Sequence, residues 1–219
     1  MDLRLPDTLS LLTLLVVVGL APFAAVLVTS FAKIVIVLSL LRAALGVQQT
    51  PPNMVLNALA LIVSAYIMAP VGMDIADNLR QKPATGIGNR PQELGHVLDA
   101  ARKPLAEFLG KHSSPRERRF FLETSRTLWP KDKADRLTEN DLIILIPSFT
   151  LTELTEAFQV GFLLYLLFVV VDLIVANILL AWGMAMLSPT LISVPFKLLL
   201  FVMLDGWSAL LHGLVLSYR

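Results

Sequence analysis

Four long apolar runs follow one another along the chain, at residues 9–30, 53–73, 158–182 and 191–216, and a polar stretch separates the second run from the third. A helix of about 20 residues crosses the roughly 30 Å hydrocarbon core of a bilayer, and each run is long enough for that. The pattern predicts an all-α, membrane-associated fold of helical hairpins. It has four hydrophobic segments and a helical polar insert between segments 2 and 3.

The last two runs also carry polar side chains. Asp172 and Asn177 lie in the first of them, and Lys197 and Asp205 lie in the second. A charge at a helix centre costs about 2.5–3.5 kcal/mol, whereas each Leu, Ile, Phe or Val contributes about 0.3–0.6 kcal/mol to insertion. With about fifteen such apolar residues, the run 191–216 gains roughly 4.5–9 kcal/mol against roughly 5–7 kcal/mol for its two charges. A helix so close to balance is expected to need protein partners.

Charge divides the chain into three parts. Residues 74–141 hold 24 of the 35 charged side chains, 13 basic and 11 acidic. We therefore expect an N-terminal hydrophobic helix pair at 1–73, a polar helical insert at 74–141 and a C-terminal hydrophobic helix pair at 142–219.

The insert itself shows helical signals. Apolar residues recur with a 3.6-residue period over 91–109. Ser114 and Glu117 form a capping-box pattern at the start of a second helix. A third helix is expected to begin at 138–141 and to end before Pro147. A basic cluster in the second helix is expected to be a solvated face, or else a contact with a partner or with lipid headgroups; it consists of Arg116, Arg118 and Arg119.

The connector between the first two runs is basic. Lys33 and Arg42 have no acidic neighbour there, which favours a cytoplasmic location for the connector and a periplasmic location for the insert. Gly46 is a candidate helix C-cap, and the two prolines at 51–52 are expected to open the next helix at Asn53.

Prolines and the N-terminus add two expectations. Pro22, Pro70 and Pro195 are each expected to kink or break an apolar helix. Small residues at 20–25 would suit a cleaved signal peptide, but the apolar run continues past them, so a retained helix is expected.

Composition supports the membrane class. Hydrophobic residues make up 56% of the chain and the mean hydropathy is +0.72, against about 45–50% apolar residues in soluble proteins. The net charge of +1 gives no reason to propose a nucleic-acid partner. The sequence has no cysteine, which excludes disulfides and thiolate chemistry.

No pattern of catalytic residues is present. His96, His112 and His212 are far apart and lack metal-ligand spacing. Glu153 and Glu156 share one helix face, where a polar contact surface is favoured over an acid–base pair. The sequence thus predicts no enzyme, no metal site and no cofactor.

Three separated stretches carry a resemblance to a known family. They are residues 31–33 with 41–53 (FAK and LRAALGVQQTPPN), residues 147–162 (PSFTLTELTEAFQVGF) and residues 195–207 (PFKLLLFVMLDGW). The chain resembles the FliP/SctR family, the R subunit of the type III secretion export apparatus, over nearly its whole length. Its start looks more like the virulence-injectisome branch than the flagellar branch.

The resemblance implies a role without catalysis. Several R subunits would assemble with the S and T subunits, alongside other export-apparatus and basal-body components, into a closed gate in the bacterial inner membrane. Unfolded secreted proteins would pass through it. The polar residues would then be buried or face neighbouring subunits rather than lipid; they are Lys33, Arg42, Gln48, Gln49, Glu153, Glu156, Asp172, Asn177, Lys197 and Asp205. A direct pairing of Lys197 with Asp205 is one such hypothesis, because eight residues along one helix bring them within about 80° of each other.

The turn at 183–188 resembles the family's methionine-rich constriction loop. Met184 and Met186 flank Ala185, where flagellar relatives tend to carry a further methionine. Methionine is unbranched and polarizable, so a ring of such side chains can seal a narrow apolar opening.

Two other functions remain open at this point. Asp172, Lys197 and Asp205, together with the expected proline breaks, are features of secondary transporters. We find no internal repeat between the hydrophobic halves, which weakens that alternative. An assembly scaffold without a pore of its own is the third.

Overall fold

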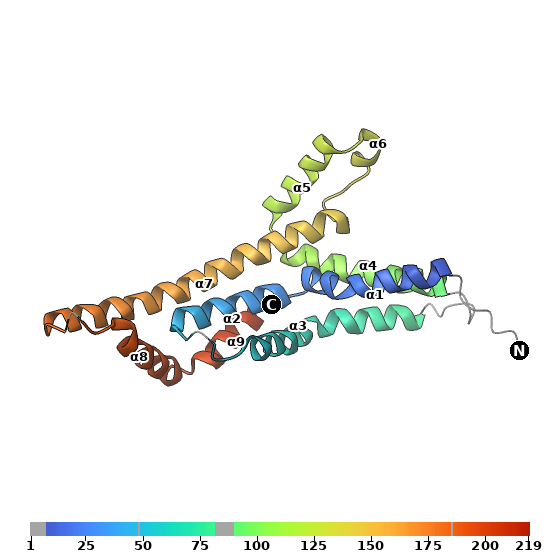
Figure 1. Ribbon diagram of the computed structural model, residues 1–219. Helices are drawn as coiled ribbons and strands as arrows, with labels where there is room; N and C mark the ends of the chain where they lie inside the picture. Colours follow the sequence, from blue (N-terminus) through green and yellow to red (C-terminus); the bar gives the residue numbers. More distant parts are fainter. Residues whose placement is uncertain (1–7, 48, 82–89, 185) are drawn as a thin grey trace, which may run out of the picture. The chain divides into compact units, whose positions relative to one another are not determined.

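The computed structural model describes residues 8–47, 49–81, 90–184 and 186–219, and these residues form helices without any strand. The all-α prediction is confirmed. In chain order (Figure 1) the helices are α1 Thr8–Val28, α2 Phe31–Leu45, α3 Asn53–Gln81, α4 Arg90–His112, α5 Pro115–Leu128, α6 Lys131–Ala134, α7 Leu142–Ala181, α8 Pro189–Met203 and α9 Gly206–Leu216.

Length and composition allow several of these helices to cross a membrane. Within the described residues, α3 and α7 are long and apolar enough to span alone. Two broken pairs, α1 with α2 and α8 with α9, bring the number to four if each pair forms one span.

The chain divides into two compact units. We call Met1–Thr29 with Met68–Thr152 the insert unit, and Ser30–Ile67 with Glu153–Arg219 the apolar unit. Helices α3 and α7 each contribute residues to both units.

The insert unit has a small core. Leu109 of α4 and Leu145 and Phe149 of α7 are buried together, and Val28 of α1 packs against them. Asn78 of α3 donates a hydrogen bond to the carbonyl oxygen of Ala100 in α4, at 3.1 Å. Helices α1, α3 and α7 thus all contact α4 or its core residues.

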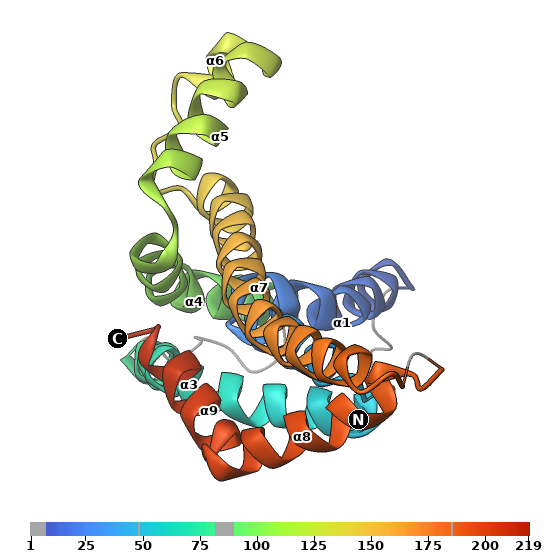
Figure 2. The same ribbon diagram turned by 90° about the vertical axis from the view of Figure 1, so that its left-hand side faces the viewer.

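Helices α5 and α6, with the residues beside them, form what we call the arm, residues 114–136. The arm projects from α4 and from the start of α7 (Figures 1 and 2). The Ser114 side chain caps α5 by accepting from the Arg116 N–H at 3.3 Å. The Ser114 N–H donates to the Thr152 hydroxyl at 3.0 Å, which takes the place that Glu117 fills in a capping box. The predicted cap by Ser114 is confirmed, but the acceptor for its own N–H is Thr152 of α7 and not Glu117.

The prolines do not end the helices that contain them. Pro22, Pro70 and Pro195 lie inside α1, α3 and α8, and α3 continues to Gln81. Pro147 lies inside α7, so the expected end of a third insert helix before it is wrong. A proline removes only one backbone hydrogen bond, and the other bonds of a long apolar helix keep it continuous.

The apolar unit is built around α2. Ile34, Val37 and Leu38 are fully buried against α3, α7 and α9. Gly161 allows α7 to approach closely, because a Cβ there would lie 2.2 Å from Leu40 Cδ1 of α2. Farther along α2, Leu41 packs with the aromatic side chains of α7 and α8. Residues 31–45 are thus a core helix, and only residues after 45 can act as a connector.

The connector is shorter than predicted, because Lys33 and Arg42 lie inside α2, but the two expected boundary signals at Gly46 and Asn53 are confirmed. Gly46 caps α2 with φ 77° and donates its N–H to the carbonyl oxygen of Ala43 at 3.1 Å. A Cβ at Gly46 would also lie 2.9 Å from Val194 Cγ2 of α8. Helix α3 begins at Asn53, as expected after two prolines.

The last apolar run is two helices, not one. Helices α8 and α9 meet at an angle of 62°. The Phe201 ring lies where a Cβ of residue 206 would be, 2.2 Å from its ideal position, so only glycine fits there. Asp205 at the break adopts φ 48°, in the left-handed region. The expectation of a continuous helix over 191–216 is therefore wrong.

Candidate functional site

A cluster of charged side chains lies inside the apolar unit. Lys33 of α2 donates to Glu156 Oε2 of α7 at 2.5 Å, and its Nζ lies 3.6 Å from Glu153 Oε1. The Lys33 and Glu153 side chains are each only 3% exposed. A charge removed from water is stable only when paired, so this cluster joins α2 to α7.

Tyr218 completes the cluster from the C-terminal end. Its hydroxyl donates to Glu153 Oε2, and the Lys33 Nζ lies 4.7 Å from the centre of its ring, a cation–π distance. Burial, together with the neighbouring negative charge of Glu153, raises the pKa of the Tyr218 hydroxyl well above its usual value. Tyr218 therefore stays a hydrogen-bond donor and holds the end of the chain against α2 and α7.

A second polar tie joins α8 to α7 and α2. Lys197 is buried and donates to Asp172 Oδ2 of α7 at 2.6 Å and to the carbonyl oxygen of Ala44 in α2 at 3.1 Å. Within the chain the partner of Lys197 is thus Asp172, not Asp205. The hypothesis of a direct Lys197–Asp205 pair assumed one continuous helix, and the break between α8 and α9 removes that geometry.

The remaining predicted residues belong neither to the cluster around Lys33 nor to the Lys197–Asp172 ion pair. Arg42 donates through Nη1 to Asn53 Oδ1 at 2.6 Å and to the carbonyl oxygen of Pro51 at 3.1 Å, which fastens the connector to α2. Asn177 and Asp205 are exposed, and the described residues include no ion-pair partner for Asp205. Gln49 is exposed as well, and Gln48 lies outside the described residues.

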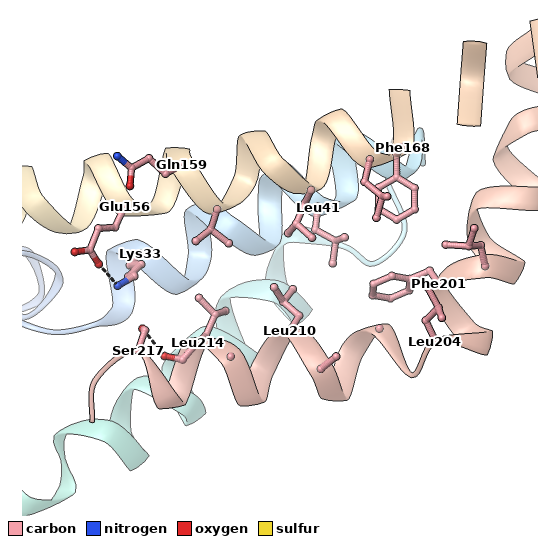
Figure 3. A pocket seen from close by; sticks show the side chains of 17 residues that line it. Lys33, Leu41, Glu156, Gln159, Phe168, Phe201, Leu204, Leu210, Leu214 and Ser217 are labelled. Carbon is pink, nitrogen blue, oxygen red and sulfur yellow. Dashed lines mark hydrogen bonds and ion pairs between the residues drawn. The ribbon is translucent and has the colours of Figure 1, made fainter. Parts of the chain in front are cut away.

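A cavity of about 670 Å³ lies beside the first cluster, between α2, α7, α8 and α9. Lys33, Glu156 and Ser217 line its polar end, and Phe168 and Phe201 line its aromatic end (Figure 3). Apolar side chains form the rest of the wall.

The methionine turn joins α7 to α8. It follows the end of α7, where Gly183 has φ 74° and the Met184 N–H donates to the carbonyl oxygen of Leu179 at 3.0 Å. Met184 is 42% exposed and Met186 is fully exposed. Both side chains are available to a neighbouring chain.

No metal site emerges from the described residues, where no three His, Asp or Glu side chains come together. Sequence reasoning missed Tyr218 and Asn53 as polar partners. The only signal for Tyr218 was a polar-tipped side chain at the end of an apolar helix. Nothing local could have indicated Ala44, whose carbonyl oxygen acts through its position alone.

Comparison with known proteins places these features in a family. The sequence model of the FliP family matches residues 14–214. The chain belongs to the FliP family. That match contains both polar clusters except Tyr218, and it contains the methionine turn.

Curated relatives identify the branch of the FliP family. The chain is 55% identical to "Pathogenicity-related ORF2" of Xanthomonas campestris pv. glycines, over 99% of this chain and 100% of that protein. It is 54% identical to the "Hypersensitivity response secretion protein HrcR" of Ralstonia nicotianae, over 96% and 97%. It is 50% identical to the "Yop proteins translocation protein R" of Yersinia pestis, over 99% of each chain.

The chain is therefore an R subunit of a type III secretion apparatus of the injectisome type. It is a membrane protein with a role in protein secretion, and it is a structural component rather than an enzyme.

Proposed function

We propose that this chain is a core subunit of the type III export gate. With further copies of itself and with the S and T subunits, it forms a closed channel through which unfolded secreted proteins cross the bacterial inner membrane. The insert lies on the periplasmic side, and other export-apparatus and basal-body components surround the gate.

The exposed methionine turn is the observation that carries the proposal. Met186 is fully exposed and Met184 is nearly half exposed, at the tip of the α7–α8 hairpin. Contact with water does not stabilise apolar side chains at such a position. In a ring of subunits they would meet around one axis and close a narrow opening, since flexible thioethers pack against irregular neighbours.

The apolar surface of α7 supports an assembly. Phe158, Phe162 and Leu163 are among its large exposed side chains. Exposed apolar patches of this kind mark contacts with protein or lipid. The exposed apolar side chains of α7 can therefore pack against partner chains and against membrane lipid.

The polar residues take two different roles in this proposal. The pairs of Lys33 with Glu153 and Glu156, and of Lys197 with Asp172, stabilise the subunit itself. Asn177 and Asp205 remain exposed and become the candidates for contacts between subunits. Gln49 is a third candidate, at the connector.

The ion pair of the apolar unit fits a structural role. Lys197 is held by Asp172 and by the backbone carbonyl oxygen of Ala44, so it joins α8 to α7 and α2. The alternative of a secondary transporter is weakened by the lack of an internal repeat between the hydrophobic halves of the sequence.

Purification of the assembly tests the proposal. Co-expressed with S and T subunits and extracted in detergent, the chain should migrate as a stable multimer that contains those partners. A density map should place the turn at 183–188 on the central axis. A monomer or simple dimer with Met184 and Met186 on its outer wall would overturn the proposal, and transport activity of that species would favour the transporter.

A further inference from the structure

The cavity of the apolar unit has one charged end and one apolar end. Lys33 on α2, Glu156 on α7 and Ser217 at the end of α9 meet at the charged end (Figure 3). At the other end the ring of Phe168 lies 6.4 Å from that of Phe201. The lining thus changes from charged to apolar along one direction, which is the pattern that an amphiphilic ligand requires.

The dimensions of the cavity suit the hydrocarbon of one leaflet. Glu156 and Phe168 are twelve residues apart on α7, which corresponds to about 18 Å along a helix. Half of a hydrocarbon core of roughly 30 Å is about 15 Å. The volume of about 670 Å³ also lies within the range of roughly 300–1,000 Å³ that is usual for small-molecule sites.

The walls of the cavity belong to elements that can cross a membrane. Helix α7 is a candidate span by itself, α8 with α9 forms a candidate broken span, and α2 is part of another. The charged end lies where the apolar run of α7 begins, because Glu156 precedes Phe158 by two residues. A lipid beside these helices places its headgroup at that boundary and its acyl chains along the apolar residues.

Small residues of α9 keep the cavity open. Ala209, Gly213 and Ser217 follow one another at intervals of one turn, and all three line the cavity. A Cβ at Gly213 would meet no atom within 4 Å. Apolar space of this kind binds apolar ligands in preference to water.

The charged end favours a ligand with a positive charge. Glu153 and Glu156 pair with Lys33 there, which leaves a formal charge of −1. Lys33 binds Oε2 of Glu156, but the Glu156 side chain is still 47% exposed, so its other oxygen can accept a hydrogen bond. The Ser217 hydroxyl donates to the carbonyl oxygen of Leu214 at 2.8 Å and keeps its lone pairs as acceptors. A primary ammonium has N–H donors for both oxygens, whereas a quaternary ammonium has none.

A second copy of the chain matches the charged end less well. The cations of the apolar unit are Lys33, Arg42, Lys197 and Arg219. The first three are already bonded within their own chain. The charge of the cavity therefore favours a lipid headgroup over another apolar unit.

We propose that this cavity binds one phospholipid whose headgroup carries a primary ammonium, as in phosphatidylethanolamine. The ammonium donates to Glu156 and Ser217, and an acyl chain lies along α9 as far as Phe168 and Phe201. Binding requires only that the chain lies in a membrane, so the proposal is independent of the gate role.

Retention of lipid by the purified protein tests the proposal. The full chain is equilibrated in detergent with equal amounts of phosphatidylethanolamine, phosphatidylcholine and phosphatidylglycerol, and the bound lipid is counted by native mass spectrometry. We expect one phosphatidylethanolamine per chain, bound several-fold more often than either competitor.

A larger side chain on α9 should exclude the lipid. Gly213→Leu should lower the retention of phosphatidylethanolamine several-fold, because its side chain enters the cavity. Gly72→Leu is the matched control, since a Cβ there also meets no atom within 4 Å and Gly72 does not line the cavity. Ala209→Leu, on the same wall, replaces Gly213→Leu if circular dichroism shows that the latter has not folded.

Removing the carboxylate should change the choice of headgroup. Glu156→Gln should reduce the preference for phosphatidylethanolamine over phosphatidylcholine several-fold. Lys33 keeps Glu153 as its partner in this variant, so the chain is expected to fold.

Three results would overturn the proposal. Equal retention of the three lipids would mean that the charged end selects no headgroup. Undiminished retention in the leucine variants of α9 would mean that the lipid lies elsewhere. A chain without bound lipid would also contradict the proposal, and a homodimer that Gly213→Leu abolishes would then identify a second copy as the occupant.

Discussion

At the residue scale, the subunit is held together by buried charges that lie far apart in sequence. Lys33 meets Glu153 and Glu156, and Lys197 meets Asp172. Losing one partner of a buried ion pair costs about 3–5 kcal/mol, because the other charge stays buried and unpaired. These ties should therefore decide whether the apolar unit folds.

The Lys197→Ala variant should lower the stability of the subunit by about 2–3 kcal/mol, less than for a fully buried pair because the Asp172 side chain is 34% exposed. The exchange of Lys197→Asp with Asp172→Lys should restore only part of the loss, since an aspartate at 197 cannot donate to the Ala44 carbonyl. Thermal unfolding of the detergent-purified chain measures both. Full recovery in the exchange would show that the carbonyl bond is unimportant.

The Tyr218→Phe variant isolates one hydroxyl. It keeps the ring beside Lys33 and removes the donor to Glu153, which should cost about 1–3 kcal/mol because a buried carboxylate oxygen loses its partner. Tyr66→Phe, at an exposed position, is the matched control and should change stability by less than about 0.5 kcal/mol. Equal thermal midpoints for the two variants would contradict the proposed role of Tyr218.

At the element scale, the junctions between helices matter more than their lengths. Gly46, Asp205 and Gly183 each adopt a positive φ, and each lies one or two residues beyond the end of an apolar helix. Phe201 against Gly206 fixes the break between α8 and α9. The methionine turn is the junction with the most exposed apolar side chains.

Shortening the methionines of that turn should open the proposed seal. Met184→Ala with Met186→Ala should make cells that express the complete assembly permeable to small ions, measured by the decay of the membrane potential. Met54→Ala with Met73→Ala, which also removes two exposed methionines, should leave permeability unchanged. If the double variant is no more permeable to small ions than the parent protein, the proposed sealing role of the two methionines is wrong.

At the scale of the whole molecule, the exposed polar residues of the apolar unit are expected to specify assembly. Asp205 is exposed at the helix break and makes no side-chain cap bond. A charge surrounded by exposed apolar side chains such as Val202, Met203 and Leu204 is costly unless a neighbour pairs with it.

Asp205→Asn should separate folding from assembly. Asparagine tolerates the left-handed backbone conformation at this position, so the thermal midpoint of the separate chain should change little. The yield of multimer with S and T subunits should fall several-fold, as measured by size-exclusion chromatography. Ser208→Ala, at an exposed position nearby, should leave the yield unchanged; an unchanged yield for Asp205→Asn would remove Asp205 from the interface.

Several features were determined by the sequence alone. The helical class, the membrane character, the Gly46 cap and the start of α3 at Asn53 were all predicted correctly. They depend on local pattern: apolar runs, a residue free to take positive φ and a pair of prolines act over a few residues. The requirement that Asp172 and Lys197 find partners was also predictable, because it follows from the cost of charge in an apolar helix.

Only the tertiary structure decided which partners meet. Lys33 and Glu153 are 120 positions apart, and their contact depends on α2 packing against α7 through Gly161. The continuity of α7 through Pro147 and the break before Gly206 were both predicted wrongly from local signals. Helix α7 continues because its other backbone hydrogen bonds outweigh the one that Pro147 removes. The break before Gly206 depends on how the Phe201 ring packs against the chain five residues later, which helical periodicity does not encode.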